Sequence, residues 1–414
     1  METPRSDIAV VRGLAERYAE AAAVPVQKER MERYRDSNSL KAPLPILLID
    51  EIPWGEMDVN GDLTLRCKEE LCRQMEWYFR SWLYRWDHLQ ADLVLPAYFP
   101  VPKCVRSTGF GFTKIERTIE STTGSDIRSH EYVDQLQTEA DLERFRLPTL
   151  TYDRAATEGS IARAQETLGG ALPVKLTGMM FSAGPWDTIA ELRGVSNLLL
   201  DLSDRPDFMR RIMEKLTEIH LHTLRQMEEL NLLEPDPIYI HCTPACTHEL
   251  PPAALDPGAV RARDVWGRYV AQIFGSVSPQ MHDEFDLTYA KRITRDCGLL
   301  YYGCCEPLDA KVDRLRQFPN LRKISITPWA NVDRAADAIG SDYVLSYKPN
   351  PAFVAVDAFD EEPVRKEISR ALRACRRNGT TCELILKDIS SVRNHPENLV
   401  LWERAAMDQI AREW

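Results

Sequence analysis

The sequence predicts an α/β protein, a (β/α)8 barrel of the TIM type with an N-terminal helical extension and a capping insertion. From residue 91 onward, short apolar runs that end in Gly, Pro or a polar residue alternate with longer amphipathic segments, a pattern typical of βα units. Eight such runs can be counted, which is the number that closes a barrel. The chain has no GxGxxG fingerprint and no Walker loop, so the pattern favours a barrel over an open nucleotide-binding sheet.

Residues 1–90 are expected to form a helical extension that leads into the barrel. Residues 8–35 alternate apolar and charged positions at helical spacing, which predicts one or two surface helices. Residues 43–51 look like a short strand with Asp50 and Glu51 at its exit, and residues 65–87 carry apolar and aromatic side chains at helical intervals.

The barrel itself is predicted to span residues 91–414. The expected strands are short and apolar, and they cover residues 92–98, 174–180, 237–242, 270–274, 299–304, 323–327, 343–347 and 382–387. The expected helices are amphipathic, and they cover residues 189–202, 207–231, 279–296, 310–318, 330–338, 361–378 and 397–412. Residues 105–150 are rich in Thr, Ser, Gly and charge, with hairpin signals at 109–112 and 118–124, so we interpret them as an insertion that caps the barrel mouth.

Composition narrows the functional classes. The 414 residues are 44% apolar and 28% charged, which describes a globular chain with ample core. The formal charge of −11 and the lack of a basic cluster argue against nucleic acid as a partner. Neither a signal pattern nor eighteen consecutive apolar residues occur, so we expect no membrane partner and a cytoplasmic protein. Its ten cysteines are then expected to be mostly reduced. A homodimer remains open.

In a (β/α)8 barrel the strand exits converge on one face, where the active site lies. Aromatic and polar side chains at the predicted exits are therefore candidates for substrate binding, although core packing explains the aromatic ones about as well. These candidates are Tyr98, Phe99, Trp186, Trp329 and Asn350. Two charged residues also lie at strand ends: Lys348, which could steady a developing anion, and Asp388, which could orient charge.

Two clusters at these exits contain metal-binding residue types. Residues 241–249 contain two His, two Cys and one Glu, all of which are residue types that bind metals. His241 and Glu249 are the candidate ligands in this segment, although its residues could equally belong to an ordinary loop. The second cluster is Cys304-Cys305-Glu306. Because side chains alternate along a strand, only one thiol can face inward unless the chain turns after Gly303. Thiolates with imidazole or carboxylate are ligands that suit zinc.

Four stretches of this chain resemble the uroporphyrinogen decarboxylase superfamily, over most of the chain after residue 40. They are residues 178–192 (GMMFSAGPWDTIAEL), Arg205-Pro206, residues 277–292 (VSPQMHDEFDLTYAKR) and the block 302–351, with YGCCEPLD, ITPWANVDRAADAIG and YVLSYKPNP. The resemblance implies a (β/α)8 barrel. The N-terminal Arg pair and the late Gly-His-Gly turn of true decarboxylases are absent, so the chain is more similar to the branch of zinc-dependent, corrinoid-linked methyltransferases.

That branch carries a His-x-Cys pair where this chain has Tyr302-Gly303-Cys304. Cys304 matches, whereas Tyr302 replaces the His, and no thiol matches the family's later Cys. The resemblance therefore implies a zinc site on Cys304 that is completed from Cys305, Glu306, His241 or Glu249. We expect Cys304, Cys305, His241 and Glu249 as ligands, and Lys348, Asp388 and Glu306 as catalytic residues.

The activity that the resemblance implies is transfer of a methyl group from a small methylated substrate, such as an aryl methyl ether, to a corrinoid (cobalamin) carried by a partner protein. Zinc would act as the Lewis acid. Two alternatives remain open. One is a metal-free decarboxylase of a small carboxylate, and the other is a non-catalytic barrel that binds a ligand or a corrinoid protein.

Overall fold

The computed structural model describes residues 4–41, 44–58, 60–89, 91–119 and 129–414. Its centre is a parallel sheet of seven strands, in the order β1-β15-β14-β13-β12-β11-β8. The strands are β1 (Ile46–Ile49), β8 (Phe181–Ala183), β11 (Trp266–Tyr269), β12 (Leu299–Tyr302), β13 (Leu321–Ile326), β14 (Val344–Tyr347) and β15 (Cys382–Leu386). The chain is therefore an α/β protein, as predicted.

The strands read as continuous apolar runs because both faces of the sheet are covered. Residues 47, 49, 300, 324 and 345 point outward into the largest apolar cluster, which lies between the sheet and the helices. Alternate residues point inward, where Ile46, Leu48 and Ile385 form a smaller cluster. The inner face also carries buried polar side chains, among them Lys323 and Glu383.

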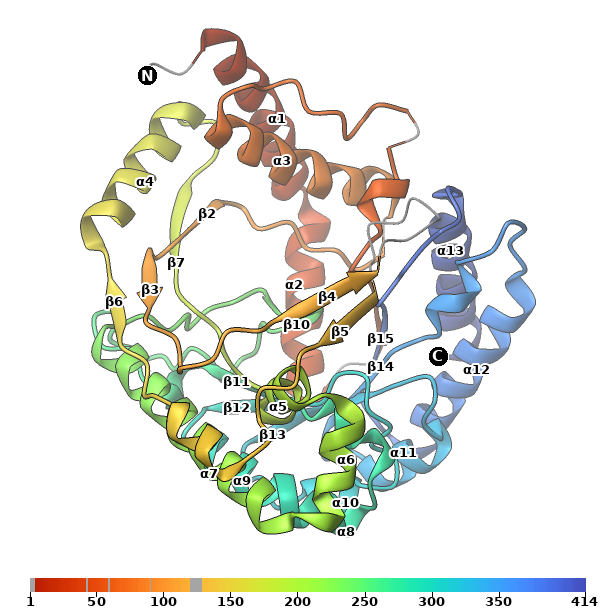
Figure 1. Ribbon diagram of the computed structural model, residues 1–414. Helices are drawn as coiled ribbons and strands as arrows, with labels where there is room; N and C mark the ends of the chain where they lie inside the picture. Colours follow the sequence, from red (N-terminus) through yellow and green to blue (C-terminus); the bar gives the residue numbers. More distant parts are fainter. Residues whose placement is uncertain (1–3, 42–43, 59, 90, 120–128) are drawn as a thin grey trace.

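Helices surround the outer side of the sheet (Figure 1). They are α5 (Pro185–Arg193), α6 (Val195–Asp204), α7 (Pro206–Glu229), α8 (Pro279–His282), α9 (Thr288–Thr294), α10 (Val312–Leu315), α11 (Val332–Ile339), α12 (Glu361–Asn378) and α13 (Glu397–Glu413). The single helix predicted at 189–202 is two helices, because Gly194 adopts a positive φ of 79° between them. A π-helical turn, η5 (Asp283–Leu287), joins α8 to α9.

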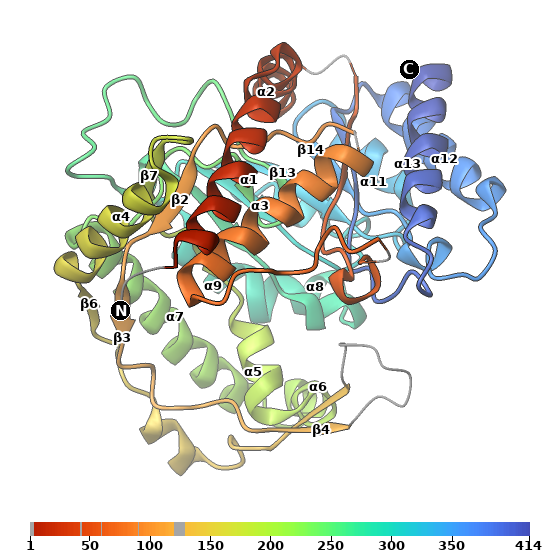
Figure 2. The same cartoon turned by 90° about the horizontal axis from the view of Figure 1, so that it is seen from above.

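Three helices lie in the first 90 residues, as predicted: α1 (Arg5–Ala23), α2 (Pro25–Asn38) and α3 (Glu70–His88). Seen from above, α1 and α3 lie in front of the strands (Figure 2). Helix α1 packs on α3 and on α4 (Arg154–Leu168). Strand β1 also belongs to the first 90 residues, yet it pairs with β15 in the main sheet. The division at residue 90 stays a prediction.

Three of the eight expected strands differ from the structure. Residues 92–98 form no strand, because Pro96 lacks the N–H that a sheet ladder requires. Strand β2 (Phe99–Pro102) follows instead and pairs, parallel, with β7 (Val174–Thr177) in a separate two-stranded sheet. The strand expected at 270–274 lies earlier, as β11, whose Gly267 and Arg268 interrupt the apolar pattern. Residues 237–242 form part of a hairpin rather than one strand.

The expected insertion at 105–150 is made of short antiparallel pairs. Strand β3 (Val105–Ser107) pairs with β6 (Leu150–Tyr152), and β4 (Glu116–Ile119) pairs with β5 (Ser129–Tyr132). A 3-10 helix, η2 (Glu139–Arg144), lies between β5 and β6 in the chain. Of the hairpin signal at 118–124, residues 120–124 lie outside the described residues. Whether the insertion caps a closed barrel stays a prediction.

None of the helices in the described ranges is both long and apolar enough to cross a bilayer.

Candidate functional site

Six polar side chains converge where β1, β12 and β15 end and where a hairpin turn lies beside them. We call this group the thiol cluster, and it consists of Glu51, His241, Cys304, Cys305, Lys387 and Asp388. Cys304, at 3% exposed, and Lys387, at 2%, are buried, whereas Asp388 is half-exposed. In the parallel sheet these strands end at the same edge, which is where α/β proteins bind ligands.

Cys304 is the centre of the cluster. Its Sγ lies 3.5 Å from Cys305 Sγ, 3.6 Å from His241 Nε2 and 3.4 Å from Lys387 Nζ. Around this centre, Cys305 Sγ donates to Asp388 Oδ2 at 3.0 Å, and Lys387 Nζ donates to Glu51 Oε2 at 3.3 Å. The geometry is that of a thiolate held by an ammonium, an imidazole and a second thiol.

The pKa of Cys304 is lowered to about 3. The neighbouring Cys305 thiol lowers it most, and His241, Lys387 and Arg268 add to this against the opposing effect of burial. The pKa of Cys305 is raised well above its usual range, chiefly by the Cys304 thiolate. Burial alone would lower the pKa of Lys387, but the negative charges around it, with Cys304 first among them, together outweigh burial and raise this pKa. One thiolate therefore faces one ammonium and one neutral thiol.

The backbone at this cluster adopts conformations that side chains other than Gly rarely take. Glu51, His241 and Asp388 have φ values of 51°, 53° and 57°. Gly303, at φ 97°, turns the chain directly after β12, so that both thiols reach the cluster. Such conformations gather at binding and catalytic sites because the surrounding structure must hold them in place.

His241 comes from a hairpin and not from a long strand. The two-residue strands β9 (Tyr239–Ile240) and β10 (Thr243–Pro244) are joined by the turn His241-Cys242. This turn directs His241 to the thiol cluster and buries Cys242 among Ile46 and Leu48. The strand predicted at 237–242 was wrong because alternation does not hold in a two-residue turn.

Glu306 holds the backbone of the cluster rather than the thiols. Its carboxylate is 1% exposed and accepts from Cys304 N at 2.7 Å and from Ala271 N at 3.1 Å. Burial raises its pKa. Its role is to position Cys304.

Two residues near Cys304 escaped the sequence analysis. Asp187, at the start of α5, has its pKa raised to about 7 by burial and then by the Glu306 and Cys304 charges. Arg268 lies on β11 and lowers the pKa of both Cys304 and Asp187. The Pro-Trp-Asp start of a helix after a strand could have pointed to Asp187. Arg268 gave no such signal, because it lies inside a strand that the apolar pattern missed.

The other expected site residues lie outside the thiol cluster. Lys348 is buried at the inner side of β14, where it donates to Ser346 Oγ. Asn350 Oδ1 accepts from Ala352 N and so caps a short turn. Glu249 forms an ion pair with Arg322.

The four aromatic candidates are spread over different environments. Trp186 is fully buried against Phe274, and Phe99 packs on Tyr78 near α3. Tyr98 is partly buried beside Lys175, and Trp329 is 72% exposed. The structure therefore brings together His241, Cys304, Cys305 and Asp388 of the predicted residues.

The thiol cluster offers sulfur and nitrogen atoms of the kind that bind zinc, and two of the distances between these atoms match a zinc site. Bonds of about 2.3 Å to sulfur and about 2.0 Å to nitrogen, at a tetrahedral angle, put neighbouring donors roughly 3.5–3.8 Å apart. Cys304 meets this spacing with both Cys305 and His241. Cys304 is thus the donor common to both spacings. Metal binding would require the other two donors, Cys305 and His241, to approach each other.

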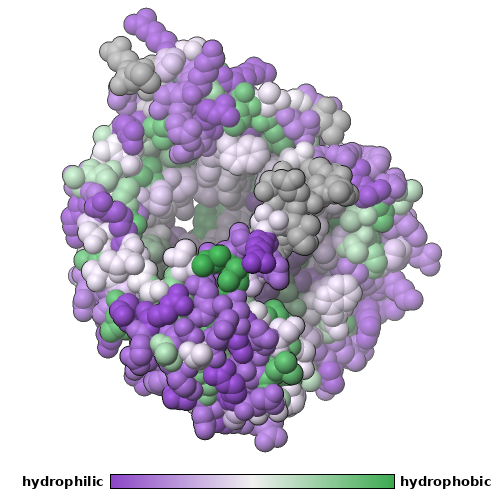
Figure 3. All heavy atoms as spheres, in the orientation of Figure 1, coloured by the Kyte–Doolittle hydropathy of each residue, from purple (hydrophilic) through white to green (hydrophobic). Residues whose placement is uncertain are grey.

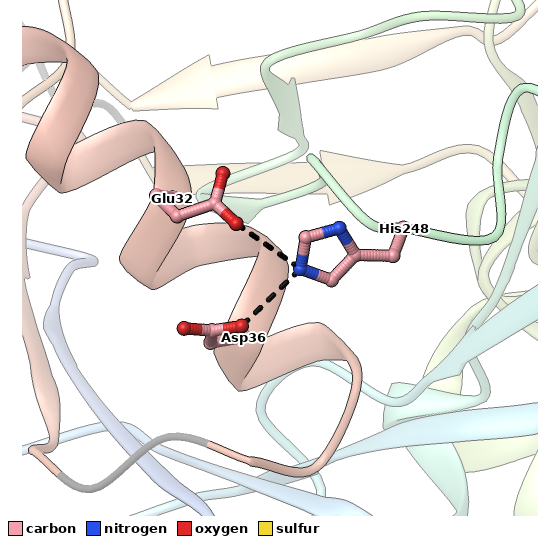
Figure 4. Close-up of side chains that lie close together, drawn as sticks. All are labelled: Glu32, Asp36 and His248. Atoms are coloured by element: carbon pink, nitrogen blue, oxygen red, sulfur yellow. Dashed lines mark hydrogen bonds and ion pairs between the residues drawn. The ribbon is translucent and has the colours of Figure 1, made fainter.

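Among the described residues, three ligand atoms that all lie within 4.8 Å of one another are found in a different group, Glu32, Asp36 and His248, and not in the thiol cluster. His248 Nε2 lies 3.3 Å from Glu32 Oε1 and 3.2 Å from Asp36 Oδ1, and the two carboxylates project from successive turns of α2 (Figure 4). All three side chains are partly exposed, so an imidazole held between two carboxylates accounts for the contact.

The face seen in Figure 1 is hollowed at its centre, as the space-filling view shows (Figure 3). In the thiol cluster, His241, Glu51 and Asp388 keep 28%, 35% and 48% of their side chains exposed. The cluster is therefore buried at Cys304 and open to solvent at its carboxylates.

Neither a protein family model nor a curated protein matches the sequence. Among solved structures, the chain is similar to a methyltransferase from Methanosarcina mazei, with a TM-score of 0.49 and 13% identity over 92% of this chain and 98% of that chain.

The Cys304 thiolate can be tested by titrating the ultraviolet absorbance of thiolates in chelator-treated protein. Since its folded pKa is depressed, Cys304 should stay charged from alkaline pH down to the pH where the folded pKa lies. At pH 6 we expect about one thiolate per chain, which Cys304→Ser removes, because an ordinary thiol with a pKa of about 8.5 is protonated there.

Lys387→Met should shift the titration of this thiolate to higher pH, since it removes the paired ammonium. Cys297→Ser is the matched control, because burial raises the pKa of that thiol to about 12. Equal absorbance of wild type and Cys304→Ser at pH 6 would show that Cys304 is an ordinary thiol.

Proposed function

We propose that this chain is a methyltransferase that moves a methyl group from a small methylated compound, such as an aryl methyl ether, to the corrinoid of a partner protein, with zinc held at the thiol cluster. One observation carries the proposal. A buried Cys304 thiolate has a second thiol and an imidazole at tetrahedral spacing, at the edge of a parallel sheet where strands end.

We also propose that the seven-stranded sheet is part of a closed (β/α)8 barrel. The inner face of the sheet is covered by its own buried side chains, as in a barrel interior. Beyond β1, Asp92 N donates to Leu47 O, which continues the ladder toward the segment before β2. The thiol cluster would then lie on the carboxyl face of the barrel, where the active sites of such barrels lie.

Cys304, Cys305 and His241 would hold the zinc, which supplies Lewis-acid polarisation of the oxygen or sulfur that carries the methyl group. In the overall reaction the carbon–oxygen bond breaks, its electron pair stays on oxygen, and the methyl group takes the electron pair of Co(I) to give methyl-Co(III).

The chain's own residues prepare this chemistry. Lys387 keeps Cys304 charged, and Glu306 fixes the Cys304 backbone through its amide. Asp187, with its pKa near 7, can hold a proton at neutral pH and give it to the departing oxygen anion. Because an acid is most effective when its pKa lies near the working pH, Asp187 suits this role.

A methyl-transfer assay tests the proposal. Protein, free reduced cobalamin and a panel of aryl and alkyl methyl ethers are mixed, and conversion of Co(I) to methyl-Co(III) is followed by absorbance. We expect transfer with at least one ether, loss of it in Cys304→Ser, and a rate about 10²–10⁴-fold lower in Asp187→Asn.

If Co(I) stays unmethylated with every ether, the chain is not the proposed transferase. A Cys304→Ser variant as active as wild type would also contradict the proposal. Release of carbon dioxide from aryl carboxylates by metal-free protein would support the decarboxylase alternative instead.

A further inference from the structure

Arg268 is an inward-facing guanidinium close to the thiol cluster. It lies on β11, and the register places it between Ser182 of β8 and Tyr301 of β12. In a parallel sheet, residues paired in this way point to the same face. Ser182, Arg268 and Tyr301 therefore form a row of hydrogen-bond donors across the inner face.

The guanidinium has almost no partner. Its one hydrogen bond runs from Nη1 to Ser182 Oγ at 3.3 Å, and its buried Nε has no acceptor within the described part of the chain. No carboxylate of the described residues forms an ion pair with it, although most arginines of this chain are paired. A buried donor without an acceptor costs roughly 1–3 kcal/mol, so such a group needs a water molecule or a bound ligand as its partner.

A second donor lies next in the row. The Tyr301 side chain is fully buried, and its hydroxyl makes no hydrogen bond of regular geometry among the described residues, although the Ser325 hydroxyl lies beside it. Of these two neighbouring donors, Arg268 is therefore the one that lacks an acceptor. A bound group with acceptor oxygens would supply it.

The position of Arg268 relative to the thiol cluster indicates which part of a substrate it can bind. It lies on β11, and directly after this strand Ala271 N donates to Glu306, the carboxylate that also holds Cys304 N, so Arg268 lies beside the proposed reaction centre. The planar fork of a guanidinium matches a carboxylate, which it binds through two parallel hydrogen bonds. Asp187 does not fill this place, because among the described residues its carboxylate accepts from Gln272 N, at 3.2 Å, and makes no hydrogen bond or ion pair with Arg268.

We propose that Arg268, with Ser182 beside it, binds a carboxylate group of the substrate, so that the preferred methyl donor is an anionic methyl ether. This inference rests on the proposed function and names its substrate class. The carboxylate anchors one end of the substrate on β11 and leaves the methyl-bearing end toward Cys304.

Binding of two probes of similar shape and different charge tests the inference, with 4-methoxybenzoate and the neutral 4-methoxybenzamide measured by titration calorimetry. Wild type should bind the benzoate at least about 10-fold more tightly than the benzamide. Arg268→Met should weaken the benzoate by about 10–100-fold and leave the benzamide unchanged. Arg268→Lys should recover only part of the loss, because an ammonium lacks the fork.

Arg263→Met is the matched control. This substitution removes a guanidinium that is 80% exposed and lies on η3 (Ala262–Asp264), just before β11. The variant should bind both probes as wild type does. Thermal unfolding of each variant checks that it is folded. Equal affinity of wild type for the two probes, or full benzoate affinity in Arg268→Met, would overturn the inference.

The two proposals can fail separately. Charge-selective binding that depends on Arg268, without methyl transfer from any ether, would keep the carboxylate subsite and remove the transferase. Methyl transfer from neutral ethers at the same kcat/KM in wild type and Arg268→Met would keep the transferase and remove the subsite.

Discussion

Lys323→Met should lower the free energy of unfolding by about 3–5 kcal/mol, the range found when one partner of a buried ion pair is removed. Both side chains of the pair are fully buried on the inner face of the sheet. Lys323 Nζ donates to Glu383 Oε2 at 2.8 Å, to Thr243 Oγ1 at 2.6 Å and to Pro244 O at 2.9 Å. The variant would leave the Glu383 carboxylate buried without its ammonium.

The loss of stability should come from the Glu383 carboxylate that is left buried without a partner, and not from the lost attraction between Lys323 and Glu383. The double variant Lys323→Met/Glu383→Leu should therefore recover most of the stability, since a buried pair can be replaced by apolar residues at little cost. Urea unfolding measures all three proteins. As a control, Arg210→Met breaks the exposed pair with Glu284 and should change stability by less than about 1 kcal/mol. A single variant as stable as wild type would mean that the interior is open to water.

The same pair predicts a pH dependence. Burial would raise the pKa of Glu383, but Lys323, and then Lys348, outweigh it and lower that pKa below its usual value. A carboxyl with a depressed folded pKa stabilises the protein fully above its unfolded pKa and loses this contribution as the pH falls through the folded pKa. The cost of Lys323→Met should therefore be full at neutral pH and shrink in acid.

Protein purified without added metal should carry about one zinc per chain, and Cys304→Ser should remove it. Cys304 is the donor shared by both spacings that match a tetrahedral site, so its loss leaves no pair of adjacent ligands. Cys305→Ser and His241→Ala should each weaken zinc by more than about 10–100-fold, the loss typical of residues that only support a ligand. Elemental analysis and competition with a chelating dye measure these changes.

Two controls make this prediction specific. The Cys297→Ser substitution alters a buried thiol that has a raised pKa and lies outside the thiol cluster. This variant should therefore bind zinc as wild type does. His248→Ala removes the imidazole of the surface group with Glu32 and Asp36, so loss of zinc there would locate the metal at that group instead. Zinc-free wild type that binds no added zinc would overturn the zinc site.

The site could be predicted from the sequence only where a side chain follows directly from a strand. Cys304 and Cys305 follow an apolar run that forms β12, and Asp388 follows β15, so these residues were placed correctly at strand ends. Lys348 satisfied the same reasoning, yet Ser346 is its partner. Glu249 was expected as a ligand from the composition of residues 241–249, yet it pairs with Arg322. Residue type and local spacing do not reveal which strand ends meet.

Local sequence by itself determined the elements and much of their order. Apolar runs buried on both faces become the parallel strands, and amphipathic segments such as α12 and α13 become the helices that cover them, since each must bury its apolar side. The pattern failed at β11, where an inward charge, Arg268, breaks the apolar run without breaking the strand.

Only the tertiary structure decided which side chains form the site. Glu51, His241 and Asp388 take left-handed backbone conformations that are uncommon for residues other than Gly, and Lys387 reaches a thiolate 83 residues away along the chain. The charge of Cys304 likewise depends on neighbours from three separate segments. Backbone conformations of this kind and long-range charge contacts gain their free energy from the folded surroundings, and for that reason they leave no trace in the spacing of residues.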